Sequence, residues 1–463
     1  MTVAASDIKT TGRGHAFVFI AAAISALGGM LFGYDTGVIS SAILFIKKEF
    51  MLSSTLEEIT VSAVLAGAVL GAFFGGKLAD YFGRRKTIIT AAIIFAVGSI
   101  WTAISPNIAT LIAGRIFVGV AIGVASFTAP MYISEVSPPK VRGELVSLNQ
   151  LAVTIGIVLS YLVGYGLAQS GNWRGMLAFA AIPAAVLGIG MFFMPSSPRW
   201  LISHSLVDKA KEVLRRIRKT QDVDSEISEV QQSLNAQGGS WKELLGPFVR
   251  PALIVGVGLA ILQQVTGINT VIYYAPTIFQ SAGFKSASSA ILATVGVGIV
   301  NVIMTVVAMQ LVDRIGRRPL LLIGLAGMTS SLAFLGLSFK LTGLTDVIGA
   351  IAAGSLMLYV GSFAIGMGPV FWLLISEIYP LKVRGIAMSS ATVFNWGSNL
   401  LVGITFLTLI NRLGRPATFW LYATLSIGTW LFVWFFVPET KGKTLEEIEA
   451  HWRKGGHPLE LGN

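Results

Sequence analysis

The feature that most constrains the fold of this chain is a series of long apolar stretches that recurs along its whole length. A helix needs about 20 apolar residues to cross the hydrocarbon core of a bilayer. Twelve stretches reach about this length, in two sets of six separated by a polar segment. They cover residues 16–45, 59–78, 87–105, 108–133, 146–168, 175–194, 251–280, 288–311, 318–339, 347–375, 386–410 and 416–437. We therefore expect an all-α integral membrane protein with twelve transmembrane helices.

The composition agrees with a membrane protein and argues against an enzyme. Only 12% of the residues are charged, whereas a soluble domain carries about 25%. The absence of cysteine excludes a disulfide framework and a cysteine-based metal site or nucleophile. The four histidines, His15, His204, His451 and His457, lie near loops or ends and form no metal-ligand cluster. We expect no metal and no cofactor.

The formal net charge of +11 is concentrated in alternate loops. Basic residues follow every second apolar stretch, at 83–86, 138–143, 198–250, 313–318 and 380–385, and are scarce in the other loops. Such alternation indicates the topology, because basic loops lie on the side of the membrane that carries anionic lipid. The positive charge is explained in this way, and no nucleic-acid partner is expected. The positive-inside rule places the basic loops and both termini in the cytoplasm. We expect a monomer that spans the cell (inner) membrane many times.

Two motif pairs show that the second half of the chain repeats the first. GGKLADYFGRRK (75–86) recurs as AMQLVDRIGRRP (308–319), and SEVSPPKVRG (134–143) recurs as SEIYPLKVRG (376–385). Because the copies keep their order and direction, we expect two parallel six-helix bundles, with a substrate bound between them near the midplane. The predicted units are a first bundle (1–194), a cytoplasmic helical linker (195–250), a second bundle (251–437) and a cytoplasmic tail (438–463).

The repeated motifs contain acids as well as bases. Topology requires only lysine and arginine, so repeated acids favour ion pairs that join the two bundles, close the cytoplasmic side and break when it opens. The alternative is topology charge combined with helix capping. The residues concerned are Asp80, Arg84, Arg85, Glu135, Arg142, Asp313, Arg317, Arg318, Glu377 and Arg384.

Further motifs resemble those of the sugar porters of the major facilitator superfamily. They are FGYDTGVIS (32–40), Arg115 with Gly119 and Gly123, PSSPRWL (195–201), QQVTGINTVIYYAP (263–276) and PETKGKTLEEIE (438–449). This family includes bacterial proton-linked xylose and galactose symporters, bacterial glucose symporters and animal facilitative glucose transporters. The resemblance covers nearly the whole chain and implies the major facilitator fold. One departure is Ser196, where the family usually has a glutamate, which implies a weaker cytoplasmic ion-pair network.

Amide side chains inside the apolar stretches suit a sugar, because a carboxamide both donates and accepts, as a hydroxyl does. The alternative is that buried amides join helices, at about 0.6 kcal/mol each, and we assign Asn149 to that role. Gln263 and Asn269 cannot face one direction in an ideal helix, but Gly267 between them permits a break. Gly366, Gly368 and Pro369 are expected to interrupt the helix of 347–375.

The resemblance implies which side chains contact the sugar. The first group is Gln150, Gln263, Gln264, Asn269, Asn301 and Trp372, and further candidates are Phe32, Phe363, Gly368, Asn395 and Trp396. Tyr273 and Tyr274 resemble the extracellular gate of this family. Ile157 stands where glucose-transporting relatives have isoleucine and the xylose-symporter type has glutamine. This favours a hexose, glucose, over xylose.

An acid, Asp35, lies within the first apolar stretch, where a charge is costly. Proton-linked relatives have aspartate at this position and facilitative relatives have asparagine. A carboxylate carries a proton only if it alternates between charged and neutral forms, and its expected partner is Arg115, with Glu135 assisting. The alternative is a permanent structural ion pair.

We expect a proton-coupled monosaccharide symporter that works by alternating access. A facilitative uniporter, a symporter of another monosaccharide such as xylose or of a polyol, and a sugar sensor remain open at this point.

Overall fold

The computed structural model describes residues 12–138, 141–218, 220, 222–236, 241–340, 345–380 and 382–462. Parts of two basic loops, residues 139–140 and 381, lie outside the described residues. Within the described ranges the secondary structure is helical, without a strand. Twelve helices there are long and apolar enough to cross a membrane, which confirms the expected fold class.

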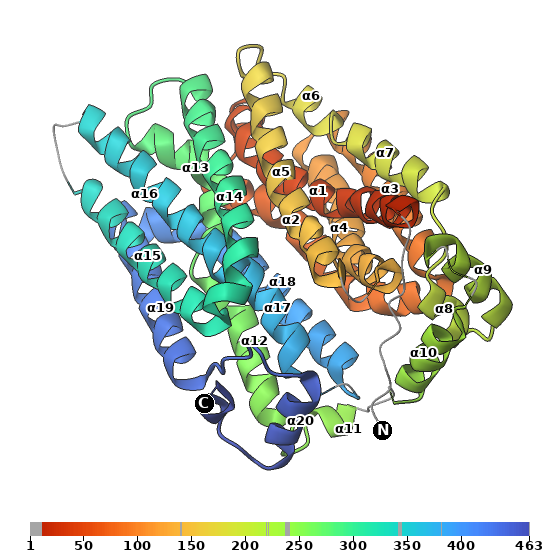
Figure 1. The fold of residues 1–463 in the computed structure, drawn as a ribbon. Helices are drawn as coiled ribbons and strands as arrows, with labels where there is room; N and C mark the ends of the chain where they lie inside the picture. The colour runs from red at the N-terminus through yellow and green to blue at the C-terminus, as the bar shows by residue number, and fades with distance from the viewer. Residues whose placement is uncertain are drawn as a thin grey trace.

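The first six spans form one bundle, drawn from red to yellow in Figure 1. Its spans are α1 (Gly12–Glu49), α2 (Ser54–Phe82), α3 (Arg84–Ala103), α4 (Ile108–Val136), α5 (Arg142–Ala168) and the pair α6 (Trp173–Ala178) and α7 (Ala181–Phe192). Most of these helices extend beyond the apolar stretches by several residues, because polar end residues continue the helix outside the hydrophobic layer.

The last six spans form the second bundle, drawn from green to blue. They are α12 (Arg250–Val265) with α13 (Ile268–Ser281), α14 (Ala287–Ile315), α15 (Arg317–Ser338), α16 (Thr345–Ile365) with α17 (Met367–Ile378), α18 (Arg384–Leu413) and α19 (Arg415–Phe436). Two of these spans are therefore each built from two helices. Both breaks fall at glycines that the sequence indicated, Gly267 and Gly366.

The repeated GRR motifs build the same corner in each half. Gly83 and Gly316 have φ angles of 86° and 109°, which glycine adopts readily, and each turns one span into the next. The second arginine of each motif then binds the carboxyl end of the last span of its half. Arg85 donates to the carbonyls of Met191 and Phe192, and Arg318 donates to the Trp434 carbonyl at 2.8 Å.

Short helices outside the spans lie at the end of the bundle where α1 begins and α19 ends, which we call the terminal end (Figure 1). The segment between the halves contains α8 (Pro198–Ser203), α9 (Val207–Arg218), α10 (Asp224–Ala236) and α11 (Trp241–Leu244). Leu214 and Ile217 of α9 pack with Val18 and Ile133 of the first half. After the last span come α20 (Leu445–Arg453) and the 3-10 helix η2 (Pro458–Gly462).

The two halves meet chiefly along α2 with α18 and along α5 with α14. Glycines permit the close approach in both pairs. A Cβ at Gly298 of α14 would lie 3.0 Å from Val158 of α5, and a Cβ at Gly403 of α18 would lie 2.9 Å from Ser62 of α2. These contacts lie toward the end of the bundle away from the termini, so the halves are closed there. We call this contact the distal seam.

Candidate functional site

The acid of the first span lies inside the first bundle against an arginine. Asp35 of α1 and Arg115 of α4 are 6% and 1% exposed, and the Oδ2 to Nη2 distance is 3.5 Å. The contact expected between these two side chains is therefore present. It is a long ion pair for two buried groups.

Arg115 is held more closely by the backbone of α2 than by Asp35. Its Nε donates to the Thr60 carbonyl at 2.9 Å, and its Nη2 donates to the Val61 carbonyl at 3.3 Å. These carbonyls replace part of the hydration that the guanidinium loses on burial. The arginine therefore keeps hydrogen-bond partners whether or not Asp35 is charged.

The expectation that Glu135 assists Asp35 is wrong. Glu135 lies 20 residues after Arg115 on the same helix, which is about 30 Å along the axis. It instead forms an ion pair with Arg84 at 3.1 Å and accepts a hydrogen bond from Ser197.

Four amides of the second half form one hydrogen-bonded network. Gln263 Oε1 accepts from Asn395 at 2.7 Å and from Gln264 at 3.1 Å, and Gln264 Nε2 also donates to Asn395 at 3.1 Å. Asn269 Nδ2 donates to Gln264 Oε1 at 2.6 Å. We call Gln263, Gln264, Asn269 and Asn395 the amide network.

The break between α12 and α13 makes this network possible. Gly267 has a φ of 93°, in the left-handed region, and this turn brings Asn269 to the side chain of Gln264. The Tyr359 hydroxyl of α16 donates to the Thr266 carbonyl at 2.8 Å, which satisfies a backbone group at the break. Tyr359 was not among the predicted site residues, and its apolar sequence context carried no signal for this role.

The second break, between α16 and α17, adjoins the same network. Gln263 Nε2 donates to the Met367 carbonyl at 2.7 Å, immediately after the break at Gly366. The Phe363 ring lies beside Gly368, where a Cβ would be 3.1 Å from the ring. Two broken spans and α18 are thus tied together by amides.

Aromatic and apolar side chains extend this region toward the first half. Phe32 of α1 makes an edge contact with Trp396 of α18, with ring centroids 5.1 Å apart.

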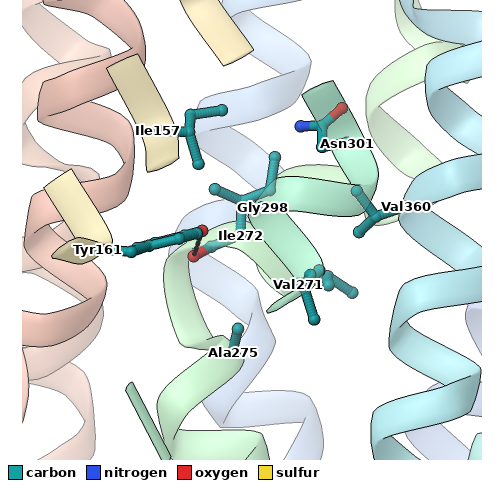
Figure 2. A pocket seen from close by; sticks show the side chains of 9 residues that line it. Ile157, Tyr161, Val271, Ile272, Ala275, Gly298, Asn301 and Val360 are labelled. Carbon is teal, nitrogen blue, oxygen red and sulfur yellow. Dashed lines mark hydrogen bonds between the residues drawn. The ribbon is translucent and has the colours of Figure 1, made fainter. Parts of the chain in front are cut away.

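Ile157 of α5 and Asn301 of α14 line one hollow, shown in Figure 2, where the Tyr161 hydroxyl also donates to the Ile272 carbonyl. Gln150 is half-buried on α5, two helical turns from Ile157. Trp372 of α17 is 37% exposed.

The two predicted gate tyrosines are both buried in α13 against α18. The Tyr273 hydroxyl lies 3.3 Å from Asn399 Nδ2, and the Tyr274 ring is 5.0 Å from the Phe406 ring. Asn399 was not singled out in the sequence, although a buried amide one turn after Asn395 was a usable signal.

The charged residues of the repeated loops pair within each half. Arg84 bonds Asp80 at 3.0 Å as well as Glu135, and Arg317 bonds Asp313 at 3.0 Å and Glu377 at 2.9 Å. Arg142 begins α5 and is exposed, and Arg384 begins α18 and donates to the Tyr379 carbonyl at 3.1 Å.

In this conformation the ion pairs of Arg84 and Arg317 lie within each half, so the expectation that the repeated charges join the halves when the cytoplasmic side closes stays a prediction. The contacts between the halves lie at the distal seam, so the terminal ends of the two bundles are held by contacts within each bundle.

The motifs PSSPR and PETKG occupy corresponding places in the two halves. Ser197 donates to Glu135, and Thr440 donates to Glu377 at 2.6 Å. Glu439 accepts from the backbone N–H groups of Arg317 and Arg318 at 3.1 and 3.0 Å and so caps α15. At the start of α3, which corresponds to α15, Ser196 stands in the place of Glu439, and no hydrogen bond from the Arg84 or Arg85 N–H to a side chain is found among the described residues.

A cation lies beside the uncapped end of the first half. Burial lowers the pKa of the Arg199 guanidinium, and the neighbouring Glu135 charge opposes this. Because an arginine stays protonated in proteins, the guanidinium still adds positive charge close to the Arg84–Glu135 pair.

Comparison with known proteins places this geometry among transporters. A family model described as "Sugar (and other) transporter" matches residues 21–452. The D-xylose transporter of Levilactobacillus brevis is 46% identical over 92% of this chain and 94% of its own length. The galactose-proton symporter of Escherichia coli (strain K12) is 41% identical, over 98% and 99%. The glucose transporter GlcP of Staphylococcus epidermidis is 41% identical, over 93% and 96%.

Solved structures give the same result for the fold. The xylose transporter XylE from E. coli, in a partially occluded inward open conformation, matches with a TM-score of 0.82 at 34% identity. The match covers 93% of this chain and 100% of that chain.

Proposed function

This chain belongs to the sugar transporter family of the major facilitator superfamily, and we propose that it imports a hexose, D-glucose, together with a proton. The observation that carries the proposal is the buried pair of Asp35 and Arg115 at 3.5 Å. It combines an acid in the membrane interior with a cation that has other partners. The transporters that this chain resembles include proton symporters, which supports the coupling.

Asp35 carries the proton in this proposal. In the outward-facing state water reaches Asp35 and the acid is protonated. Loss of the proton restores the charge and strengthens the attraction to Arg115, and this pairing biases the conformation. Because Thr60 and Val61 carbonyls bond Arg115, the guanidinium keeps hydrogen-bond acceptors when Asp35 is neutral, which lowers the cost of separating the buried pair.

The amide network binds the sugar in this proposal. Its members bond one another, and each of these bonds can be exchanged for one to a sugar hydroxyl, which donates and accepts as a carboxamide does. Gln150, Asn301 and Trp372 complete the set, with Phe32, Phe363, Gly368 and Trp396 as further contacts. Tyr273 and Tyr274 act as the gate at the distal seam.

Ile157 supports a hexose, since it lines the same hollow as Asn301. The relatives include transporters of xylose, galactose and glucose. Xylose is therefore the second candidate substrate, favoured by the xylose-transporting relative at 46% identity.

We also propose how the protein is oriented in the membrane and which segments form its structural units. The basic loops, the short helices and both termini face the cytoplasm, so the closed distal seam is extracellular and the conformation faces inward. A XylE structure in a partially occluded inward open conformation has a similar fold, which agrees with this orientation. The ion pairs of Arg84 and Arg317 stabilise the cytoplasmic corners of the units 1–194 and 251–437, which work as a monomer in the cell membrane.

The decisive experiment replaces Asp35 by Asn in proteoliposomes. Accumulation of radiolabelled D-glucose driven by a pH gradient is lost, while exchange of D-glucose at equal concentrations persists. If Asp35→Asn still accumulates glucose with the pH gradient, Asp35 does not couple sugar transport to proton movement. If the unmodified protein accumulates no sugar with a gradient but exchanges it, the protein is a uniporter.

A further inference from the structure

A second buried acid lies at the distal seam and is bonded across it. Glu58, in the first turns of α2, is 2% exposed. Its Oε1 accepts from the Thr408 backbone N–H at 2.6 Å, and its Oε2 accepts from the Thr408 hydroxyl at 2.8 Å. Thr408 belongs to α18 of the other half. Both carboxylate oxygens are therefore used in a contact between the halves.

The neighbouring acid has a different partner. Glu57 is 1% exposed and pairs with Lys47 of α1 at 2.6 Å, within the first half. Among the ion pairs of the described residues, none includes Glu58. The two adjacent glutamates are thus distinguished by whether the bond stays within one half or crosses to the other.

Other polar groups near the distal seam are buried without a partner. In the part of the chain that the structure describes, Ser62 Oγ, Tyr274 Oη and Thr277 Oγ1 have no hydrogen-bond partner. An unpaired buried polar group is destabilising, and native proteins contain few of them. Such groups are better accommodated in a surface that meets water in another conformation of the same protein.

We propose that Glu58 and Thr408 form a latch that closes the distal seam and is released when the halves separate there. Charge-assisted hydrogen bonds of this kind exist only in the closed state, so they favour it over the open one. The latch deepens the proposed function by assigning residues to the extracellular closure of the transport cycle. It rests on that function for its role, although the contact itself does not depend on which sugar is carried.

A distance measurement between two spin labels tests the latch. The chain has no cysteine, so Thr55→Cys and Arg412→Cys, both at exposed positions, introduce two unique labels at the distal ends of α2 and α18. The measurement is made by pulsed electron paramagnetic resonance on the full chain in proteoliposomes, without sugar. Glu58→Gln removes the charge and keeps only one acceptor oxygen, so the two charge-assisted hydrogen bonds from Thr408 are replaced at best by weaker neutral ones. We expect the ratio of molecules with a long label-to-label distance to molecules with a short one to rise by roughly tenfold.

Two further variants make the test specific. Thr408→Val removes one of the two donors and keeps the side-chain volume, so we expect a smaller shift in the same direction. It also keeps the latch testable if Glu58→Gln does not fold. Glu57→Gln is the matched control, because it neutralises the adjacent acid without touching the cross-seam contact, and we expect the distances to stay unchanged. Unchanged distances in both Glu58→Gln and Thr408→Val overturn the latch, as does an equal shift in Glu57→Gln.

The apparent KM for sugar on each side of the membrane distinguishes a conformational role of Glu58 from a general loss of stability. A shift toward the open distal seam raises the fraction of molecules that bind sugar from that side. For Glu58→Gln we expect the apparent KM for D-glucose to fall by several-fold at the distal side and to rise at the other. A KM that rises on both sides contradicts the latch. If the distances shift but the unmodified protein accumulates no glucose with a pH gradient, the proposed function fails and the latch stands.

Discussion

At the scale of single residues, Ile157 offers the sharpest test of the substrate. It is 4% exposed and lines the same hollow as Asn301. An apolar side chain there contacts carbon rather than hydroxyl groups, which suits the sixth carbon that a hexose has and a pentose lacks. The difference of one such group is worth about 1–3 kcal/mol.

We expect Ile157→Gln to lower the preference for D-glucose over D-xylose by roughly tenfold. The measurement is inhibition of radiolabelled D-glucose uptake by unlabelled xylose, galactose and fructose. Ile157→Val is the control, because it keeps an apolar side chain and should keep the order of competition. If the order is the same in Ile157→Gln, this side chain does not select the sugar.

The amides show what single residues reveal before a structure is known. Gln263, Gln264 and Asn269 attracted attention because a polar side chain in an apolar stretch is costly without a purpose, and they do lie together. Glu58 was missed because it lies just before the apolar stretch 59–78, where an acid looks like an ordinary helix end. Its partner Thr408 is 350 residues away in the sequence, and only the tertiary structure brings them together.

At the scale of the elements, the break at Gly267 positions the amide network. A residue with a Cβ costs roughly 1–2 kcal/mol in this left-handed conformation, and the Cβ would also lie 2.9 Å from the Tyr422 ring. Gly267→Ala should therefore shift the start of α13 and move Asn269 away from Gln264.

We expect Gly267→Ala to weaken D-glucose binding by roughly tenfold or more, in line with the loss of a hydrogen bond to a buried polar group. Binding is measured as the concentration dependence of sugar exchange in proteoliposomes. Gly428→Ala in α19 is the control, since an added Cβ there meets nothing within 4 Å. Equal affinities in the two variants would show that the break does not position the site.

The caps of α3 and α15 give a second prediction for the elements. Glu439 caps α15 through two backbone N–H groups, whereas Ser196 stands at the corresponding place of the first half. A carboxylate at a helix N-terminus contributes about 0.5–2 kcal/mol. Ser196→Glu should raise the midpoint of thermal unfolding in detergent, and Glu439→Ser should lower it. An unchanged midpoint in Ser196→Glu would mean that the first half has no room for the same cap.

The breaks show that glycine and proline are partial signals. Gly267 and Gly366 were identifiable because glycine permits unusual backbone angles. The span of α6 and α7 also breaks, at Phe179 and Ala180, four residues before Pro183, which has no N–H to bond the Phe179 carbonyl; this signal was missed. Pro130, in contrast, lies inside α4 without dividing it. A proline alone therefore does not decide whether a span is divided.

At the scale of the whole molecule, the repeated motifs were sufficient to predict two parallel bundles, because copies in the same order and direction permit few other arrangements. The contacts between the halves were harder to predict from the sequence. The acids of the repeated loops suggested ion pairs that join the halves when the cytoplasmic side is closed, and in this conformation Arg84 and Arg317 each pair within their own half. Sequence spacing shows that charges are repeated, but it does not show which conformation closes which end.

The orientation in the membrane is the last prediction, and it concerns the whole molecule. Each basic residue near an anionic surface contributes about 1 kcal/mol, and the basic loops all lie on the side of the termini, so this side should be cytoplasmic. Lys285→Cys lies between α13 and α14, and Lys443→Cys precedes α20; both positions are exposed. In intact cells a membrane-impermeant maleimide should label Lys285→Cys and should label Lys443→Cys only after the membrane is permeabilised. Since the chain has no other cysteine, the reverse pattern would invert the orientation and make the closed distal seam cytoplasmic.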